Sequence, residues 1–388
     1  MKLRLLLLLF LISFFSFAQQ AVGQVKGQCS TCHTMHNSQN NSKMVYMGTS
    51  GATAWAGWNG SAVLQGGTAA PSPQASLLVS DCVGCHTSTT GDTIITIGST
   101  RVPIVFNTGG YPANPLAGGN FYRVAQSGGD AYGHNVRGIS AQDGALITLG
   151  APGTVGCSNS CHVTLTLTDA QTDGQRKNGC QGCHQSVKHH GSDPAGSPVG
   201  AAGGYYRFLS APPGHDMVGG GGVHGIEDPN WEQNPTASNH NAYYGGTGAD
   251  DEDPESIGKF CAGCHYNFHS PGFVTTMWGT DNGGGVNPWF RHPADYAIPN
   301  SGEYLNYTVY SPTVPIARPE SSLTGGVGYS STVRPGTDKV FCLSCHRAHG
   351  SQYSDMLRWS YSMMVPGTTG AGAGTGCFVC HSDKDDVP

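Results

Sequence analysis

Hydrophobic positions in this 388-residue chain gather in a few short stretches, which long polar and glycine-rich segments separate. The first stretch is Leu5–Phe17, an almost continuous apolar run preceded by a lysine and an arginine. A basic start, an apolar run of this length and the small residues Ser16 and Ala18 predict a secretory signal peptide over residues 1–18. A second group of small residues would allow cleavage as late as residue 23. The run is too short to span a bilayer, which disfavours the alternative of a membrane anchor.

The rest of the chain predicts only short elements. Residues 94–106 and 163–168 are rich in β-branched residues and are typical of short strands. A short helix is expected over residues 355–364. The glycine-rich tracts are expected to be loops, at 200–204, 218–222, 283–285 and 367–376. The predicted fold is therefore mostly coil with short helices and a few short strands, and no break in composition divides residues 24–388 into more than a single domain.

Composition adds a difficulty that the fold must solve. The chain has 58 glycines and 23 prolines, and charged residues make up only 11%. Such a sequence would struggle to close a core from its own side chains, so another group is expected to fill the interior. The net charge of −6 and the lack of a basic region argue against a nucleic-acid partner. The acidic stretch 250–255 fits a solvated loop better than the alternative of a calcium site.

The cysteine pattern indicates which group fills the interior. All 14 cysteines fall into seven pairs, and a histidine follows the second cysteine of every pair. In the c-type haem motif CxxCH, two thiols bind the haem vinyl groups and the histidine coordinates the iron. A disulfide framework or zinc ribbons would not require a histidine after every pair. The predicted attachment sites are Cys29/Cys32/His33, Cys82/Cys85/His86, Cys157/Cys161/His162, Cys180/Cys183/His184, Cys261/Cys264/His265, Cys342/Cys345/His346 and Cys377/Cys380/His381.

The third site is irregular. Three residues separate Cys157 from Cys161, whereas the other pairs are separated by two. The intervening serines and asparagine are small turn formers that can absorb the extra residue, and His162 is in place. We therefore expect seven haem c groups, or six if this pair is a disulfide or stays unmodified.

Ten histidines remain after the seven proximal ligands are counted. If every iron binds two imidazoles, seven of these ten are needed as distal ligands. The predicted distal ligands are His36, His134, His190, His240, His269, His292 and His349. His189 is passed over for its neighbour His190, and His215 and His224 rank lowest because glycine-rich sequence surrounds them. Methionine ligands are disfavoured because histidines are in surplus, and Arg291 is a candidate partner for a haem propionate.

Several stretches together resemble a known family. They are CSTCHTMHNS at 29–38, WFRHPADY at 289–296, CLSCHRAHGSQYSDMLRW at 342–359 and a last CxxCH near the C-terminus. They resemble the OmcS-like multihaem cytochromes, doubled-CxxCH proteins of metal-reducing bacteria that form extracellular filaments. The resemblance implies a core made of one row of stacked, bis-histidine haems. It also implies that His36 ligates the Cys342/Cys345 haem of a neighbouring subunit. The chain departs from the best-known member by one extra haem, assigned to the Cys157/Cys161 site, and by the unmatched loop 200–257.

These features predict an electron-transfer protein without catalytic residues. Iron bound by two histidines is six-coordinate, so it exchanges electrons and does not bind substrate. We expect an exported protein without a membrane anchor that assembles end to end, receives electrons from partner cytochromes and passes them to extracellular acceptors. A monomeric periplasmic shuttle is the alternative. A multihaem oxidoreductase with an open iron is less favoured, since no CxxCK motif occurs and distal histidines are sufficient.

Overall fold

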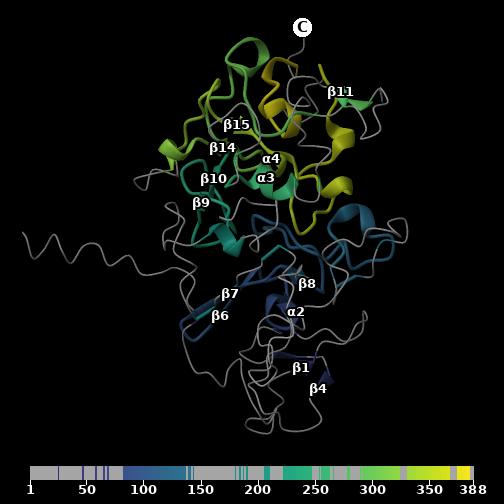
Figure 1. Cartoon of the computed structure of the whole chain (residues 1–388). Coiled ribbons are helices and arrows are strands. Elements are labelled where there is room, and N and C mark those ends of the chain that lie inside the picture. The colour runs from purple at the N-terminus through teal and green to yellow at the C-terminus, as the bar shows by residue number, and fades with distance from the viewer. Residues whose placement is uncertain are drawn as a thin grey trace, which may run out of the picture.

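The structure is a computed structural model of the whole chain, in which part of the chain can be described (Figure 1). The described residues are 25, 46–47, 57–58, 64–65, 68–69, 82–136, 139–140, 143, 180, 183–184, 187, 189–190, 205–209, 222–246, 253, 255–262, 265, 278–279, 289–290, 292–323, 330–367 and 374–384.

Most of the described chain is coil, as the sequence predicts. The α-helices are single turns or little more: α2 (Cys82–His86), α3 (Ile257–Ala262) and α4 (Cys342–Cys345). The 3-10 turns are η2 (Asp130–Tyr132), η5 (Tyr206–Phe208), η7 (Gly302–Tyr304), η8 (Glu320–Ser322), η9 (Ser354–Met356), η10 (Tyr361–Met363), η11 (Gly376–Val379) and η12 (Ser382–Lys384). None of the described helices is long and apolar enough to cross a membrane.

A five-stranded sheet organises the C-terminal part, in the upper half of Figure 1. Its order is β13 (Tyr296–Ala297), β15 (Lys339–Val340), β14 (Ala317–Arg318), β10 (Ala242–Tyr244) and β9 (Gly225–Ile226). The central pair β10 and β14 is parallel, with Tyr243 opposite Ala317, and the other pairs are antiparallel. The sheet therefore brings segments far apart in the sequence beside α3 and α4.

The strands expected over 94–106 are confirmed. β6 (Ile94–Ile97) and β7 (Thr100–Pro103) form an antiparallel hairpin. The chain continues into β8 (Phe106–Asn107), the edge of a sheet that also holds β5 (Thr87–Ser88), β2 (Gly57–Trp58) and β3 (Leu64–Gln65). Two further pairs are β1 (Tyr46–Met47) with β4 (Thr68–Ala69) and β11 (Trp278–Gly279) with β12 (Trp289–Phe290). The strand expected over 163–168 lies outside the described residues.

The helix expected over 355–364 is wrong. The two turns η9 and η10 occupy this stretch. Asp355 and Met356 have φ angles of 59° and 56°, in the left-handed region that cannot continue an α-helix. Their carbonyl oxygens accept from His346 Nδ1 at 2.7 Å and from the Arg347 backbone N–H at 2.9 Å, so tertiary contacts replace the intrahelical bonds.

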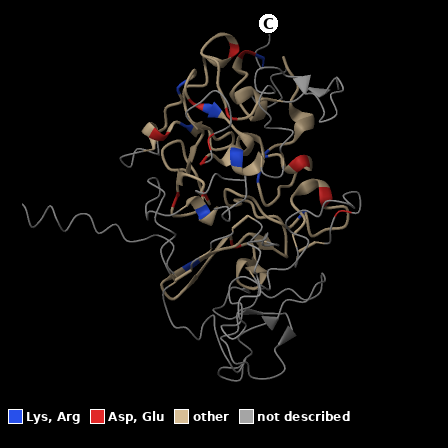
Figure 2. Cartoon of the chain, in the orientation of Figure 1, with Lys and Arg blue, Asp and Glu red and all other residues tan. Residues whose placement is uncertain are grey.

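The apolar core is divided into small clusters. One cluster packs Tyr206, Tyr243 and Phe341 between η5, β10 and α4, and another gathers around Tyr310 in the C-terminal part. Charged residues are sparse over the described chain (Figure 2), but some are buried. The Arg318 and Asp338 side chains are 1% and 0% exposed, with Nη1 and Oδ2 3.8 Å apart, and the Arg318 guanidinium also donates to two backbone carbonyls.

We predict that Arg318→Met destabilises the folded protein by about 3–5 kcal/mol, because it leaves the buried Asp338 carboxylate without its buried cation and with only the exposed Arg334 side chain nearby. Chemical denaturation of the haem-loaded protein measures the change. The matched control is Arg334→Gln, since Arg334 approaches the same Asp338 carboxylate at 3.5 Å from a side chain that is 47% exposed. That change should cost at most about 1 kcal/mol. Equal effects of the two variants would contradict the prediction.

Candidate haem sites

The CxxCH motifs that are described throughout, at α2, α4 and η11, each form one helical turn. In such a turn, residues i, i+3 and i+4 lie on the same face, so the spacing brings both thiols and the histidine to one side. In four motifs the backbone N–H of the histidine donates to the carbonyl of the first cysteine at 2.9–3.0 Å; they involve His184, His265, His346 and His381. The fifth described motif is the helix α2 itself. The extra residue between Cys157 and Cys161 changes this spacing, but that site lies outside the described residues.

The described cysteines are not in disulfides; they are Cys82, Cys85, Cys180, Cys183, Cys261, Cys342, Cys345, Cys377 and Cys380. Burial raises the pKa of Cys345 and of Cys380 to about 12, which is the opposite of an activated thiolate. Within the described ranges, no group of three or more His, Cys, Asp or Glu could hold a metal ion. The other predicted ligands, Cys29, Cys32, His33, His36, Cys157, Cys161, His162, Cys264 and His269, lie outside the described part.

The histidine rings come together in pairs. Four of the five described proximal histidines face a second histidine with ring centres 6.1–6.2 Å apart. The pairs are His86 with His189, His184 with His349, His265 with His134 and His381 with His292. Every pair joins segments that belong to different loops of the chain.

This separation fits one metal ion between two imidazoles. Two metal–nitrogen bonds of about 2 Å, plus roughly 1 Å from each nitrogen to its ring centre, add up to about 6 Å. Rings packed directly on each other lie much closer, as His240 and Tyr310 do at 3.5 Å. The pairs are therefore spaced for a ligand-bound iron and fit a haem bound through the adjoining cysteines.

Five of the described histidine rings share one kind of hydrogen-bond partner at Nδ1. A backbone carbonyl oxygen lies 2.7–2.8 Å from Nδ1 of His86, His134, His184, His292 and His346. A carbonyl oxygen can only accept, so Nδ1 must carry the proton. In a neutral imidazole the lone pair then resides on Nε2, which is the tautomer that an iron ligand requires.

His349 is held by packing. Its ring stacks on Phe121 with centres 5.0 Å apart, and a Cβ built on Gly118 would lie 2.9 Å from its Nδ1. That Nδ1 atom is buried and has no hydrogen-bond partner among the described residues. Burial, and then the nearby His184, His134 and His86, lower the pKa of His349 to about 3. The ring is therefore neutral, as a metal ligand must be.

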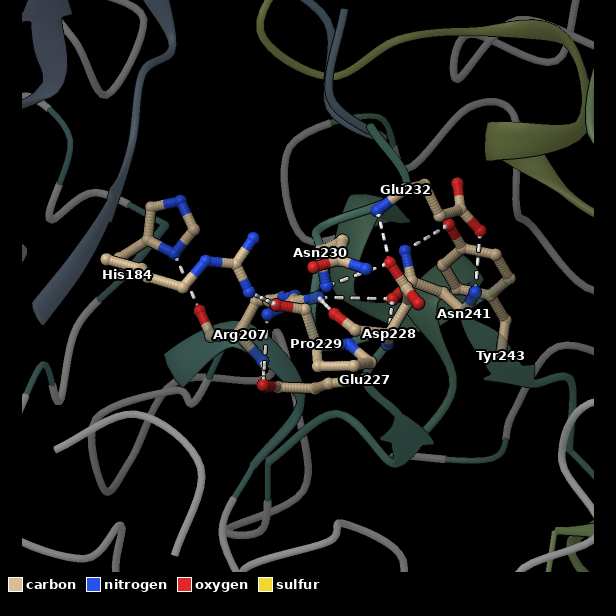
Figure 3. A network of polar contacts seen from close by, with 10 residues as sticks. His184, Arg207, Glu227, Asp228, Pro229, Asn230, Glu232, Asn241 and Tyr243 are labelled. Atoms are coloured by element: carbon tan, nitrogen blue, oxygen red, sulfur yellow. Dashed lines mark hydrogen bonds and ion pairs between the residues drawn. The ribbon is translucent and has the colours of Figure 1, made fainter. Parts of the chain in front are cut away.

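A polar network fixes the backbone that orients His184 (Figure 3). His184 Nδ1 donates to the carbonyl of Arg207, which has a φ of 48°. The Arg207 guanidinium lies 3.0 Å from Glu227 Oε2 and donates to the Asp228 carbonyl and to Asn241 Oδ1. These contacts compensate for a strained backbone conformation, so the carbonyl stays aimed at the histidine.

The remaining histidines lie in different surroundings. The sequence favoured His190 over His189; in the structure both side chains are exposed, and the His189 ring lies 6.2 Å from that of His86. His240 is fully buried, donates to the Asn241 carbonyl and stacks on Tyr310, and it faces none of the described proximal histidines. His224 Nδ1 lies 3.6 Å from Glu320 Oε1. No described histidine ring faces His346.

Two arginines beside His346 were not predicted as site residues. Arg347 and Arg358 line a cavity of about 170 Å³ together with Glu232. Burial, and then Arg358, lower the pKa of Arg347 to about 10. Arg358 Nη2 is buried without a partner in the described part, and neither guanidinium has a carboxylate within ion-pair distance there. Glu232 is a single carboxylate that acts on both guanidinium groups from a distance, so the cavity keeps an excess of positive charge that suits the carboxylate of a haem propionate.

Comparison with known proteins gives two kinds of similarity. Residues 334–386, which contain the last two attachment sites, match the family described as the doubled CXXCH motif. Among solved structures, the chain is similar to the Outer Membrane Cytochrome S filament from Geobacter sulfurreducens, with 22% identity, coverage of 88% of this chain and 85% of that chain, and a TM-score of 0.46. It is also similar to the OmcS nanowires from Geobacter sulfurreducens, with 20% identity, coverage of 87% and 84%, and a TM-score of 0.46. No curated protein matches. The doubled attachment motif predicted from the sequence is thus confirmed for residues 334–386.

Proposed function

We propose that this protein is a multihaem c-type cytochrome that conducts electrons along a row of bis-histidine haems. The observation that carries the proposal is the set of four histidine pairs at 6.1–6.2 Å, each containing the histidine of a CxxCH motif. A haem iron bound on both sides has no position for a substrate, so its chemistry is the uptake and release of an electron. The protein supplies attachment, ligation and spacing.

The contacts between sites suggest the order of the row. His349, of the Cys180/Cys183 site, is close enough to His86 and to His134 for both to affect its pKa. His134, of the Cys261/Cys264 site, has the same effect on His346. Cys345, in turn, interacts with Cys377 and Cys380. The proposed order of the described haems therefore follows the sequence, from the Cys82/Cys85 site to the Cys377/Cys380 site.

The second ligand of the Cys342/Cys345 haem comes from another subunit in this proposal. No ring in the described part faces His346, although its Nδ1 is anchored like those of the paired histidines. His36 lies three residues after His33 and has no easy access to the far face of its own haem. If His36 of one subunit binds the haem at Cys342 and Cys345 of the next, the rows join into a filament. Export and electron delivery to extracellular acceptors complete the proposed role.

We predict that Gly118→Ala disrupts one haem and leaves the others low-spin. The added Cβ would lie 2.9 Å from His349 Nδ1, and relieving the clash moves the ring from its ligand position at a cost of about 1–3 kcal/mol. Visible and EPR spectra of the oxidised protein measure the high-spin fraction. Gly91→Ala is the control, since a Cβ there meets nothing within 4 Å. Carbon monoxide binding by the unmutated reduced protein would favour an enzyme with an open iron.

We predict that His36→Ala abolishes filaments and leaves one iron with an altered spin state, because one haem loses its ligand from the neighbouring subunit. Electron microscopy and EPR of the purified protein measure both effects. His190→Ala is the matched control, as His190 is exposed and its neighbour His189 faces the haem site. A wild-type protein that is monomeric with all irons low-spin would refute ligation between subunits.

We predict that the irregular site carries haem. The intact mass of the mature protein should then correspond to seven haems, and the double variant Cys157→Ala, Cys161→Ala should lose the mass of one haem beyond the two sulfur atoms. Removing both thiols eliminates the covalent attachment and leaves the six regular sites unchanged. A wild-type mass with six haems would contradict the prediction.

A further inference from the structure

One proximal histidine has a different hydrogen-bond acceptor. The Nδ1 atoms of His86, His184 and His346 contact neutral backbone carbonyls, whereas His381 Nδ1 lies 2.8 Å from Oε1 of Glu303. A carboxylate carries a full negative charge and is the stronger acceptor. The Cys377/Cys380 site therefore differs from the Cys82/Cys85, Cys180/Cys183 and Cys342/Cys345 sites, because its proximal ligand is hydrogen-bonded to an anion.

Glu303 is positioned to keep this contact. It lies in η7, and its backbone carbonyl accepts a hydrogen bond from the Ser382 hydroxyl, next to His381 in η12. Lys384 Nζ approaches the same Oε1 atom at 3.4 Å. The Glu303 and His381 side chains are only 21% and 22% exposed, so solvent screens their interaction incompletely.

A carboxylate acceptor changes the ligand strength of the ring. It draws the Nδ1 proton towards itself and makes the imidazole more basic at Nε2. A more basic ligand stabilises the oxidised iron, which has the higher positive charge, more than the reduced iron. The reduction potential of that haem falls as a result.

We propose that Glu303 lowers the reduction potential of the Cys377/Cys380 haem below those of the haems at Cys82/Cys85, Cys180/Cys183 and Cys342/Cys345. This inference rests on the proposed function, because it requires His381 and His292 as the axial ligands of that haem. Its reduced iron then gives up one electron, and the oxidised iron of the neighbouring Cys342/Cys345 haem gains it, with no proton exchanged. The last site thus becomes an electron entry point at one end of the described row.

The test is Glu303→Gln, which keeps a neutral oxygen acceptor of the same size for His381 Nδ1. In a spectroelectrochemical titration of the full-length haem-loaded protein, one haem's share of the absorbance change should move to a more positive potential. Removal of an outer hydrogen-bond partner typically changes the metal affinity or activity of a site tenfold or more. A tenfold change in the equilibrium constant of a one-electron couple corresponds to 59 mV, so a shift of about this size is expected. The shares of the other haems should not move.

Two further variants separate the hydrogen bond from a general charge effect. Asp383→Asn removes one negative charge from the same η12 turn, where Asp383 accepts from Asn306 and does not contact His381 Nδ1. It should shift the same haem by less than half as much. Lys384→Gln removes the cation that shares Oε1 and should move this haem to a more negative potential. This variant provides a second test of the effect of the Glu303 charge if Glu303→Gln does not fold.

The outcomes are distinguishable. Unchanged potentials in Glu303→Gln, or equal shifts in Glu303→Gln and Asp383→Asn, overturn the role of Glu303 while the low-spin spectrum still supports paired ligation. A wild-type spectrum with a high-spin iron at this site, seen before any titration, overturns the proposed function and this inference with it. A large positive shift restricted to one haem in Glu303→Gln supports the inference.

Discussion

The structure depends on one geometric constraint, the separation of about 6 Å at which two imidazoles can share an iron. In the four described pairs, the proximal histidine belongs to a CxxCH motif and its partner comes from a distant loop, as His349 does for His184. The loops that carry the second histidine of each pair must therefore bring its ring to the first, whatever their own conformational preferences. In the proposed cytochrome, cross-links through metal ligation would add to the small apolar clusters beside them and would explain how a glycine-rich chain can hold a defined fold.

The constraint also accounts for the strained backbone. Arg207 and Asp355 are both non-glycine residues in the left-handed region, and the carbonyl of each accepts a hydrogen bond from a proximal histidine. Such a conformation costs roughly 1–2 kcal/mol per residue. The cost is tolerated where the carbonyl must point at Nδ1, because an unanchored ring would lose its tautomer and orientation. The irregular loops are thus specified by the ligands they orient.

The sequence predicted what is local and missed what is made by tertiary contact. The CxxCH turns and the strands over 94–106 follow from spacing and pattern within a few residues. The helix over 355–364 failed because carbonyls that would close it are used by His346 and Arg347. The preference for His190 over His189 could not be decided from two adjacent identical residues, since the face that meets His86 depends on how a distant loop approaches. No feature of the sequence pointed to Glu303 as a partner of His381, because the two residues are 78 positions apart.

Anchoring by backbone carbonyls has a consequence for electron flow. A carbonyl is neutral, and sparse charged residues add few local fields, so most sites present the iron with similar surroundings. Similar surroundings favour similar potentials, and electrons then move along the row without large uphill steps. Among the described sites, a difference arises where a charged side chain replaces the carbonyl, as Glu303 does at His381, or where partly buried cations lie close, as Arg347 and Arg358 do beside His346. In the proposed cytochrome, an anion at one site and cations at the next would displace the two potentials in opposite directions, which would favour electron movement from the Cys377/Cys380 haem towards the Cys342/Cys345 haem.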